Sequence, residues 1–378
     1  MIPFNKPHLT GKEIEYVNDA INSGKIAGDG KYTKACEAFF EKRYSFAKAY
    51  LTTSCTHAIE LAALLIDIKP GDEVIIPSYT FVSSANPFVL RGAKVVFADS
   101  GANSPSMDVD LVEALVTPLT KAILAVHYGG IPCDIQKLRT IADKHNLFLI
   151  VDAAQTLDSY YNDKPVGSFG HLSAFSFHET KNITCGEGGL LVVNDERFIE
   201  RAEILREKGT NRSSFVRGEV SRYNWVDVGS SYIPSDILAA YLFAQLQYID
   251  EIQQKRLSIW KKYYQSLNTL HTNKKIKLPH LPEGVKHNAH TFYFTCNSLQ
   301  IRQKFIIFMN DNGVQVQFHY MSLHNSPFYK DQHGNRELPM SDHYQNCLVR
   351  LPLFYDMTDD DVETVTELTL RFFNTYKT

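Results

Sequence analysis

The chain has 378 residues, of which 44% are hydrophobic and 21% are charged, and its formal net charge at pH 7 is −3. This is the composition of an ordinary globular protein, long enough for one large domain and a smaller one. It excludes a strongly basic nucleic-acid-binding protein, and no apolar run approaches the ~20 residues of a membrane span. The N-terminus lacks the apolar core of a signal peptide. We therefore expect a cytoplasmic protein whose partners are neither nucleic acids nor membranes.

The first part of the chain predicts two helices, a strand and a third helix. Residues 10–23 are expected to form a helix that Thr10 and Glu13 cap and that Gly24 ends. The elements expected next are a helix over residues 31–44, a strand over 47–51 and a helix over 55–68.

Apolar runs and amphipathic segments then alternate. Strands are expected over residues 73–76, 94–98, 122–126, 147–151, 173–177 and 190–193. Helices are expected over residues 81–90, 109–115, 135–145 and 196–207. This alternation is typical of an α/β sheet that is mostly parallel. No Gly-x-Gly-x-x-Gly follows a strand, so a dinucleotide-binding site lacks its fingerprint.

The last third of the chain has a different pattern. Residues 210–231 are polar and aromatic and predict an ordered functional loop. A long helix is expected over 235–267, followed by strands over 290–296 and 314–319 and helices over 300–310 and 359–373. We therefore predict a large α/β domain over residues 1–250 and a small α+β domain over residues 251–378.

The cysteines and histidines do not predict a metal site. The six cysteines are spread along the chain without a Cys-x-x-Cys pair, which indicates free thiols. His287 and His290 have metal-ligand spacing, but no third ligand lies in a matching motif. We therefore expect no bound metal.

Lys181 lies in the most informative stretch of the sequence. It follows the apolar run 173–177 and precedes a glycine-rich turn, 186–189. Desolvation disfavours an ammonium group, so a lysine walled by apolar residues becomes a usable nucleophile near neutral pH. Such an amine suits a Schiff base with a carbonyl, as in the chemistry of pyridoxal phosphate (PLP). The alternative is a solvated loop lysine, since most lysines are exposed.

Asp152 provides a second signal. It ends the apolar run 147–151, which is typical of a strand buried on both faces. Ligands of open α/β sheets bind at the carboxyl ends of strands, where this carboxylate would lie. PLP needs a carboxylate to keep its pyridine nitrogen protonated. The alternative role for Asp152 is a helix N-cap.

These stretches resemble the DegT/DnrJ/EryC1/StrS family of sugar aminotransferases, and the resemblance runs through nearly the whole chain. The motifs that carry it are Asp152-Ala153-Ala154-Gln155, Ser176-Phe177-His178-Glu179-Thr180-Lys181-Asn182 and Gly186-Glu187-Gly188-Gly189. Further similar stretches lie at residues 28–30, 77–83, 206–212, 229–232 and 351–355. The resemblance implies a PLP-dependent transferase of fold type I, with a large, mostly parallel sheet domain and a smaller C-terminal α+β domain.

The resemblance also implies which residues bind PLP. Lys181 would bind the cofactor's aldehyde carbon, Asp152 the ring nitrogen and Gln155 the phenolic oxygen. Phe81 would stack on the pyridine ring; its alternative is a core aromatic. The residues expected to bind the phosphate are Cys55, Thr56, Ser176 and Ser231. For the segment around Cys55 the alternative is a plain Ser/Thr helix cap.

Ser231 stands where the family commonly has asparagine. In the family this residue reaches the phosphate in the partner subunit, which implies a homodimer with shared active sites. A serine can still donate one hydrogen bond, but its reach is shorter. The segment Gly229-Ser230-Ser231-Tyr232 resembles the members of the family that act in enterobacterial common antigen synthesis.

The resemblance implies L-glutamate as the amino donor and a dTDP-4-keto-6-deoxy sugar, dTDP-4-dehydro-6-deoxy-D-glucose, as the acceptor. Amination at C4 would give dTDP-4-amino-4,6-dideoxy-D-galactose. A basic and polar loop, formed by Lys208, Asn211, Arg212 and Arg217, could bind the diphosphate of the nucleotide sugar. The alternative is a loop that is only solvated. The residues expected to contact the substrate are His178, Lys208, Asn211, Arg212, His319 and His324.

Other functions remain open. The product could be the gluco epimer or a C3-amino sugar. A family relative that removes a hydroxyl group carries histidine at the lysine position, so Lys181 argues against that reaction. Cys185 lies near the lysine, but the surrounding motif does not fit a cysteine desulfurase-like lyase. A non-catalytic binding protein of the same fold is disfavoured because the lysine, the aspartate and the phosphate set are all present.

Overall fold

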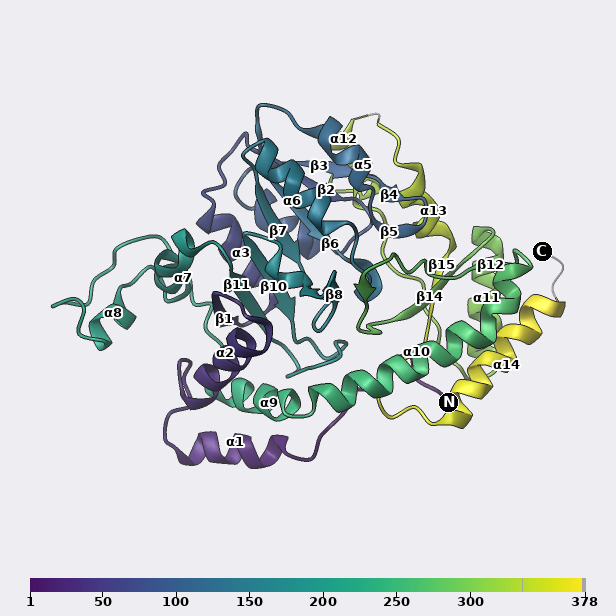
Figure 1. The fold of residues 1–378 in the computed structure, drawn as a ribbon, viewed down its shortest axis with the longest axis horizontal. Helices are drawn as coiled ribbons and strands as arrows, with labels where there is room; N and C mark the ends of the chain where they lie inside the picture. Colours follow the sequence, from purple (N-terminus) through teal and green to yellow (C-terminus); the bar gives the residue numbers. More distant parts are fainter. Residues whose placement is uncertain (335, 376–378) are drawn as a thin grey trace.

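A twisted seven-stranded sheet forms the centre of the protein in a computed structural model that describes residues 1–334 and 336–375 (Figure 1). The strand order is β1-β11-β10-β7-β6-β2-β3. All neighbouring strands are parallel except that β11 runs antiparallel to β1 and to β10. In that order, the strands are Lys48–Thr52, Gly189–Val193, Leu172–Ser176, Phe148–Asp152, Thr120–Val126, Glu73–Pro77 and Lys94–Ala98. The mostly parallel α/β sheet is therefore confirmed.

Helices cover both faces of this sheet because successive strand residues point to opposite sides. Leu149 and Val151 of β7 belong to the same buried cluster as residues of α2, α6 and α9, whereas Ile150 belongs to the cluster of α3, α4 and α7. These helices are α2 Lys31–Tyr44, α3 Cys55–Leu65, α4 Asn86–Val89, α6 Ile135–Lys144, α7 Ile199–Arg206 and α9 Asp236–Leu246. Helix α1, Glu13–Asn22, packs against α9.

The C-terminal part of the chain has a core of its own. Helix α10, Ile249–Thr272, runs from the large sheet toward a three-stranded antiparallel sheet of order β12-β14-β15 (Figure 1). Trp260 of α10 packs there with Phe292, Phe305 and Phe372. The elements around this core are β12 Ile276–Lys277, β14 Phe292–Cys296, α11 Leu299–Asp311, α13 Pro339–Cys347, β15 Leu348–Leu351 and α14 Asp359–Thr375.

Short elements complete the described chain. The strands are β4 Ser100–Gly101, β5 Ser104–Met107, β8 Tyr160–Tyr161, β9 Lys164–Pro165 and β13 Val285–Lys286. The helices are α5 Val109–Val112, α8 Arg212–Val216 and α12 Lys330–His333, with 3-10 turns at Val82–Ser84, Glu113–Leu115, Tyr128–Gly130, Val166–Ser168, Glu196–Phe198 and Leu323–Asn325.

Three sequence predictions about elements are wrong in detail. The helix expected over 81–90 is a 3-10 turn followed by the one-turn α4, because Pro87 supplies no N–H group and Phe81 is extended. The helix expected over 235–267 breaks at Tyr248 into α9 and α10. The strand expected over 314–319 forms only two isolated bridges, Ile2 with Val314 and Gln317 with Arg350, because its two partners lie on different segments.

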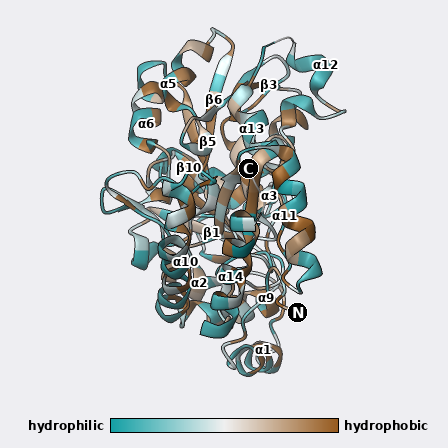
Figure 2. Ribbon diagram, turned by 90° about the vertical axis from the view of Figure 1, so that its right-hand side faces the viewer, coloured by the Kyte–Doolittle hydropathy of each residue, from teal (hydrophilic) through white to brown (hydrophobic). Residues whose placement is uncertain are grey.

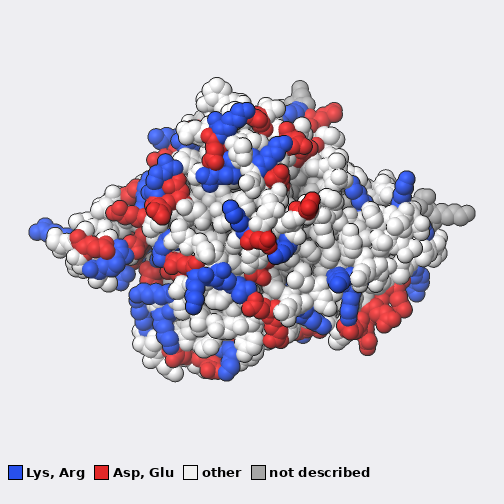
Figure 3. All heavy atoms as spheres, in the orientation of Figure 1, with Lys and Arg blue, Asp and Glu red and all other residues white. Residues whose placement is uncertain are grey.

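The distribution of side chains follows the layers. The strands at the centre of the molecule are predominantly apolar, whereas the outer helices alternate polar and apolar residues (Figure 2). On the face drawn in Figure 3, lysines and arginines lie beside acidic residues over most of the surface. Within residues 1–334 and 336–375, no helix is long and apolar enough to cross a membrane, and no three His, Cys, Asp or Glu residues are grouped as metal ligands.

Candidate active site

A cavity of about 870 Å³ lies at the carboxyl ends of the sheet strands. Its wall includes residues of the segments that follow β1, β2, β7 and β10, together with Gln315, residues 317–321 and the N-terminal residues Phe4, Asn5 and Pro7. The carboxyl edge of an open α/β sheet is where ligands bind in this architecture. The cavity brings together Lys181 and Asp152, the two residues that carry the sequence argument.

Lys181 lies on the hairpin loop between β10 and β11. The loop is fixed beside it, because the buried Asn182 donates to Gln253 Oε1 at 2.8 Å and to the Asn288 carbonyl at 2.8 Å. Burial lowers the pKa of Lys181, and the charge of Arg350 adds to this effect. The Lys181 amine has no hydrogen-bond or ion-pair partner in the described part of the chain. It is therefore a partly buried amine that is available to a ligand.

Asp152 ends β7 and is held from two sides. Its Oδ2 accepts from Ser84 Oγ at 2.7 Å, and its Oδ1 accepts from the Ala154 N–H at 3.1 Å. Ser84 also lies 2.9 Å from Thr80 Oγ1, so a short hydroxyl chain supports the carboxylate. Burial raises the pKa of Asp152, and the hydrogen bond from Ser84 is the main opposing effect. A cationic ligand atom beside this carboxylate would favour its charged form.

The start of helix α3 forms another part of the wall. Ser54 is its N-cap and accepts from the His57 N–H at 3.1 Å. The N–H groups of Cys55 and Thr56, in the first turn, are not used inside the helix, and both residues line the cavity. Strand β11 approaches this turn so closely that a Cβ on Gly189 would lie 2.3 Å from the Ser54 carbonyl carbon. Ser176, the last residue of β10, also lines the cavity.

Aromatic and amide groups form the remaining wall. Phe81 leaves 55% of its surface exposed, and its ring centroid lies 6.2 Å from that of Tyr320. Gln155 is fixed at both ends: it accepts from the Gly129 N–H at 2.7 Å and donates to the Tyr320 hydroxyl at 2.9 Å. His319 stacks on Tyr320 with ring centroids 3.6 Å apart.

Two histidines of the expected substrate set line this cavity. His178 places Nδ1 3.0 Å from Thr180 Oγ1 and Nε2 3.6 Å from a Glu187 carboxylate oxygen. His319 Nδ1 lies 2.6 Å from the Tyr128 hydroxyl. Burial lowers the pKa of His319 well below its usual value, so its imidazole is neutral.

Comparison with known proteins identifies this arrangement. The model of the DegT/DnrJ/EryC1/StrS aminotransferase family matches residues 7–369. The chain belongs to this family. It is 33% identical to a GDP-perosamine synthase of Vibrio cholerae over 99% of this chain and 100% of the relative.

Solved structures agree with this assignment. The PLP form of Spr1654 from Streptococcus pneumoniae, described as a sugar aminotransferase, has a TM-score of 0.91 at 28% identity and covers 100% of both chains. The aminotransferase TlmJ from Streptoalloteichus hindustanus also has a TM-score of 0.91, at 28% identity, with 99% of each chain covered. The protein is therefore a PLP-dependent sugar aminotransferase of fold type I.

The residues that line the cavity of this aminotransferase have the chemical groups that PLP requires. Lys181 offers an unpartnered amine for an aldehyde, Asp152 a buried carboxylate for a ring nitrogen, and the first turn of α3 free N–H groups for a phosphate. The exposed ring of Phe81 can cover a planar ligand. The individual contacts to PLP remain predictions.

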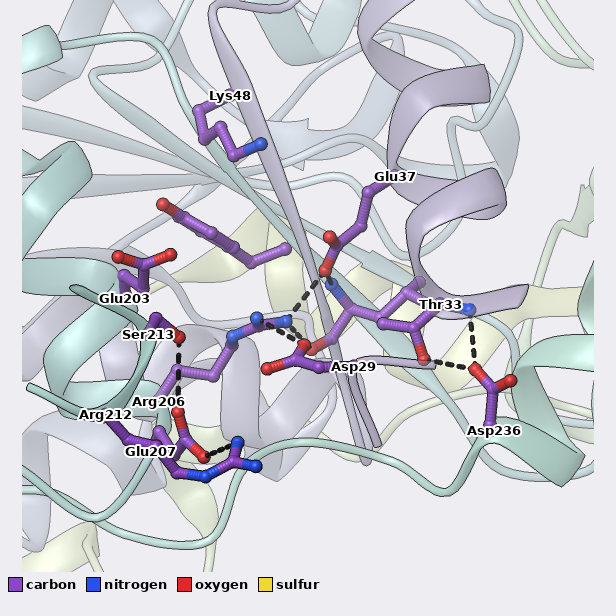
Figure 4. Close-up of polar contacts among 12 residues, drawn as sticks. Asp29, Thr33, Glu37, Lys48, Glu203, Arg206, Glu207, Arg212, Ser213 and Asp236 are labelled. Atoms are coloured by element: carbon purple, nitrogen blue, oxygen red, sulfur yellow. Dashed lines mark hydrogen bonds and ion pairs between the residues drawn. The ribbon is translucent and has the colours of Figure 1, made fainter. Parts of the chain in front are cut away.

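Other residues expected from the sequence lie outside this cavity. Segments 206–212 and 229–232 are held together, since Glu207 and Ser231 form an isolated bridge. Beside them the buried Arg206 joins Glu37 and Asp29, each at 2.7 Å (Figure 4). Burial opposes ionisation of Arg206, but the two carboxylates outweigh it and raise its pKa.

The substrate residues of this loop point to local partners. Arg212 Nη1 lies 2.8 Å from Glu207 Oε1 (Figure 4), the Lys208 N–H donates to the Ser230 carbonyl at 2.9 Å, and Asn211 Oδ1 accepts from the Asn224 N–H at 2.7 Å. Neither these residues nor Ser231 line the cavity of their own chain. Their roles remain predictions that require a partner subunit.

His324 also lies outside the cavity. It is buried, its Nδ1 lies 2.6 Å from Ser78 Oγ, and its Nε2 lies 3.5 Å from an Asp342 carboxylate oxygen. A structural role in holding residues 323–325 against β2 accounts for these contacts. Its contact with substrate remains a prediction without support from the cavity.

Sequence reasoning missed several cavity residues. Ser84 follows the similar stretch 77–83 by one position, so its place beside Phe81 was the available signal. Arg350 directly precedes the similar stretch 351–355. Asn5 gave no signal, because its amide reaches the Glu179 carbonyl at 3.4 Å across 174 positions of sequence.

Proposed function

We propose that this aminotransferase moves the amino group of L-glutamate to C4 of a nucleotide-linked 4-keto-6-deoxy sugar and releases 2-oxoglutarate. The observation that carries the proposal is that Lys181 and Asp152 line one cavity, with the free N–H groups of α3 in the same wall. Family membership supports a nucleotide-sugar acceptor.

Bound PLP supplies an aldehyde that carries the amino group and a protonated ring that withdraws electrons from the reacting carbon. Asp152 would keep the ring nitrogen protonated, because a carboxylate in contact with a cation favours the charged form of both. Phe81 and Gln155 would orient the ring, and Cys55, Thr56 and Ser176 would bind the phosphate. With PLP bound, Lys181 Nζ would take the proton from the α-carbon of L-glutamate and return it to the former aldehyde carbon of the cofactor, because burial lowers its pKa and favours the neutral amine.

Two acceptors are candidates. The stretches 206–212 and 229–232 favour dTDP-4-dehydro-6-deoxy-D-glucose, with dTDP-4-amino-4,6-dideoxy-D-galactose as the product for enterobacterial common antigen. The Vibrio cholerae relative, which is named for GDP-perosamine, favours a GDP-linked sugar. His178 and His319 would contact the sugar, and Lys208, Asn211 and Arg212 would contact the diphosphate from the partner subunit.

The proposal includes a homodimer. Ser231 does not line the cavity of its own chain, which supports a contact with the PLP phosphate of a second copy. The adjoining segment exposes large apolar side chains, among them Trp225, which is 80% exposed.

The test supplies PLP-loaded protein with L-glutamate and one of the two keto sugars. Mass spectrometry of the sugar product, followed by NMR, identifies the aminated carbon and its configuration. Amination at C4 of either sugar supports the proposal, and the better substrate identifies the nucleotide. Lys181→Ala is the control and should give no product. Amination at C3, or no amination of either sugar, would contradict the proposal.

A further inference from the structure

Arg350 is a cation in the cavity wall that has no acidic partner. It lies in β15 and forms no ion pair within residues 1–334 and 336–375. Its Nη2 has only two long contacts, 3.3 Å to the Phe318 carbonyl and 3.5 Å to Gln317 Oε1. Its Nε is buried and has no hydrogen-bond partner. A guanidinium presents five N–H donors, so most of this group's capacity is unused.

The side chain is nevertheless held in place. The Arg350 guanidinium carbon lies 4.6 Å from the centroid of the Phe4 ring, a cation–π contact. The backbone of Arg350 pairs with Gln317 through hydrogen bonds of 2.8 and 3.3 Å. Phe4 is fixed in turn, because its N–H donates to Gln315 Oε1 at 3.2 Å. Arg350 is thus positioned by an aromatic ring and by backbone contacts, which leave its charge available to a ligand.

The surroundings of Arg350 favour an anion. Burial is the largest effect that lowers the pKa of His319, and the charge of Arg350 is the second largest. The charge of Arg350 also lowers the pKa of His290. Both imidazoles are therefore neutral and do not compete as cations. The buried carboxylate of the cavity, Asp152, is engaged by Ser84 and by the Ala154 N–H. Arg350 thus brings to this wall a guanidinium that has no ion-pair partner within the described residues and whose Nε is buried, which favours an anionic ligand.

We propose that Arg350 binds the α-carboxylate of the amino donor, an assignment that rests on the proposed function. A planar guanidinium matches a carboxylate through two parallel hydrogen bonds. Arg350 lies close enough to Lys181 for its charge to act on that amine. The α-carboxylate is one bond from the carbon whose proton Lys181 removes. The diphosphate of a nucleotide sugar is several bonds from the keto carbon and would therefore lie farther from Lys181 than the α-carboxylate of the donor does.

The decisive variants are Arg350→Met, which keeps an unbranched apolar stem but removes the guanidinium, and Arg350→Lys, which keeps the charge but not the planar fork. The matched control is Arg302→Met. Arg302 also lies over an aromatic ring, that of Phe318 at 5.1 Å, and also has a buried unpaired Nε, but it does not line the cavity.

The measurement is stopped-flow absorbance of the PLP-loaded proteins mixed with increasing L-glutamate. We expect the apparent Kd for L-glutamate to rise roughly 30- to 1,000-fold in Arg350→Met, less in Arg350→Lys, and not in Arg302→Met. Glutarate, a dicarboxylate without an amine, should inhibit the wild type and lose its inhibition to a similar extent in Arg350→Met. The KM for the keto sugar should change less than about threefold, because a residue that binds only the donor leaves acceptor affinity unaltered.

An unchanged Kd for L-glutamate in both Arg350 variants would overturn the assignment. A rise in the KM for the keto sugar with unchanged donor affinity would also overturn it and would place the diphosphate at Arg350. If Arg350→Met does not fold, Arg350→Lys and the glutarate inhibition decide. A wild-type enzyme that does not respond to L-glutamate would overturn the proposed function itself, so the two failures are distinguishable.

Discussion

At the scale of single residues, Asp152 shows a conflict between stability and function. Burial raises its pKa, so the folded protein without PLP binds a proton at this carboxyl more tightly than the unfolded chain does. Its contribution to the free energy of unfolding therefore increases as the pH falls through the raised pKa toward the ordinary value of about 3.9. At neutral pH the charged, buried carboxylate of Asp152 lowers the free energy of unfolding, and PLP binding offsets this loss.

Asp152→Asn should accordingly stabilise the PLP-free protein at neutral pH while impairing catalysis. The gain in the free energy of unfolding, measured by urea denaturation at several pH values, should shrink as the pH is lowered, because the wild-type carboxyl then becomes neutral. Turnover should fall roughly 10- to 200-fold, the effect of losing a hydrogen bond to a charged group.

A matched carboxylate provides the control for Asp152. Asp99 is also buried but accepts from the Ser341 N–H at 2.7 Å and the Met340 N–H at 3.1 Å, outside the cavity. Asp99→Asn should therefore destabilise the protein and leave turnover unchanged. Destabilisation of the PLP-free protein by Asp152→Asn at neutral pH would contradict this account.

Single residues also show what sequence could and could not predict about the site. Lys181 and Asp152 were predictable because each follows an apolar run that is typical of a buried strand, and parallel strands end at one edge. The sequence placed Ser84 and Arg350 next to similar stretches but could not predict their roles, because these depend on contacts made across the fold, to Asp152 and to Phe4.

At the scale of elements, the start of α3 combines a structural and a binding role. The Ser54 side chain accepts a hydrogen bond from one N–H group of the first turn that has no partner inside the helix. The same turn contributes free N–H groups to the cavity. Ser54→Ala should lower the free energy of unfolding by about 1 kcal/mol. It should also weaken PLP binding, because a frayed first turn no longer holds its N–H groups in place.

Ser298→Ala separates these two effects. Ser298 caps α11 in the same way, accepting from the Ile301 N–H at 3.3 Å, and lies outside the cavity. Both variants should lose similar stability in thermal unfolding, but only Ser54→Ala should raise the Kd for PLP in a fluorescence titration. Equal PLP affinity in the two variants would argue against a phosphate site at α3.

Prediction of elements succeeded where one periodicity extends over the whole element. The strands of the large sheet were found because each is a short and nearly continuous apolar run. Prediction failed where tertiary contacts decide: the break at Tyr248 lets α9 pack against α1 while α10 leads to the C-terminal core. Residues 314–319 alternate like a strand, but their pairing is divided between Ile2 and Arg350.

At the scale of the whole molecule, helix α8 and the loop that follows it project away from the large sheet (Figure 1). This segment exposes large apolar side chains that a monomer would leave in water, namely Phe215, Val216, Tyr223, Trp225, Val226 and Val228. It lies next to Ser231, so the same surface that would contact a second copy would also deliver that residue to the neighbouring cavity.

Trp225→Ser should therefore weaken self-association. A central aromatic contact contributes about 2 kcal/mol or more, so the dimer dissociation constant should rise roughly 30-fold or more in sedimentation analysis. Ile307→Ser is the control, since Ile307 on α11 is 60% exposed but distant in sequence from Ser231. If both variants associate like the wild type, the surface around Trp225 is not the interface.

The central claim is that Lys181 binds PLP and that L-glutamate donates the amine. The most direct measurement is the visible absorption spectrum of the purified, PLP-supplemented protein before and after L-glutamate, with Lys181→Ala alongside. We expect a band of lysine-bound PLP in the wild type that L-glutamate removes, with 2-oxoglutarate formed in equal amount, and no such response in Lys181→Ala. A wild-type protein without this band, or a Lys181→Ala variant that converts L-glutamate at a similar rate, would contradict the account.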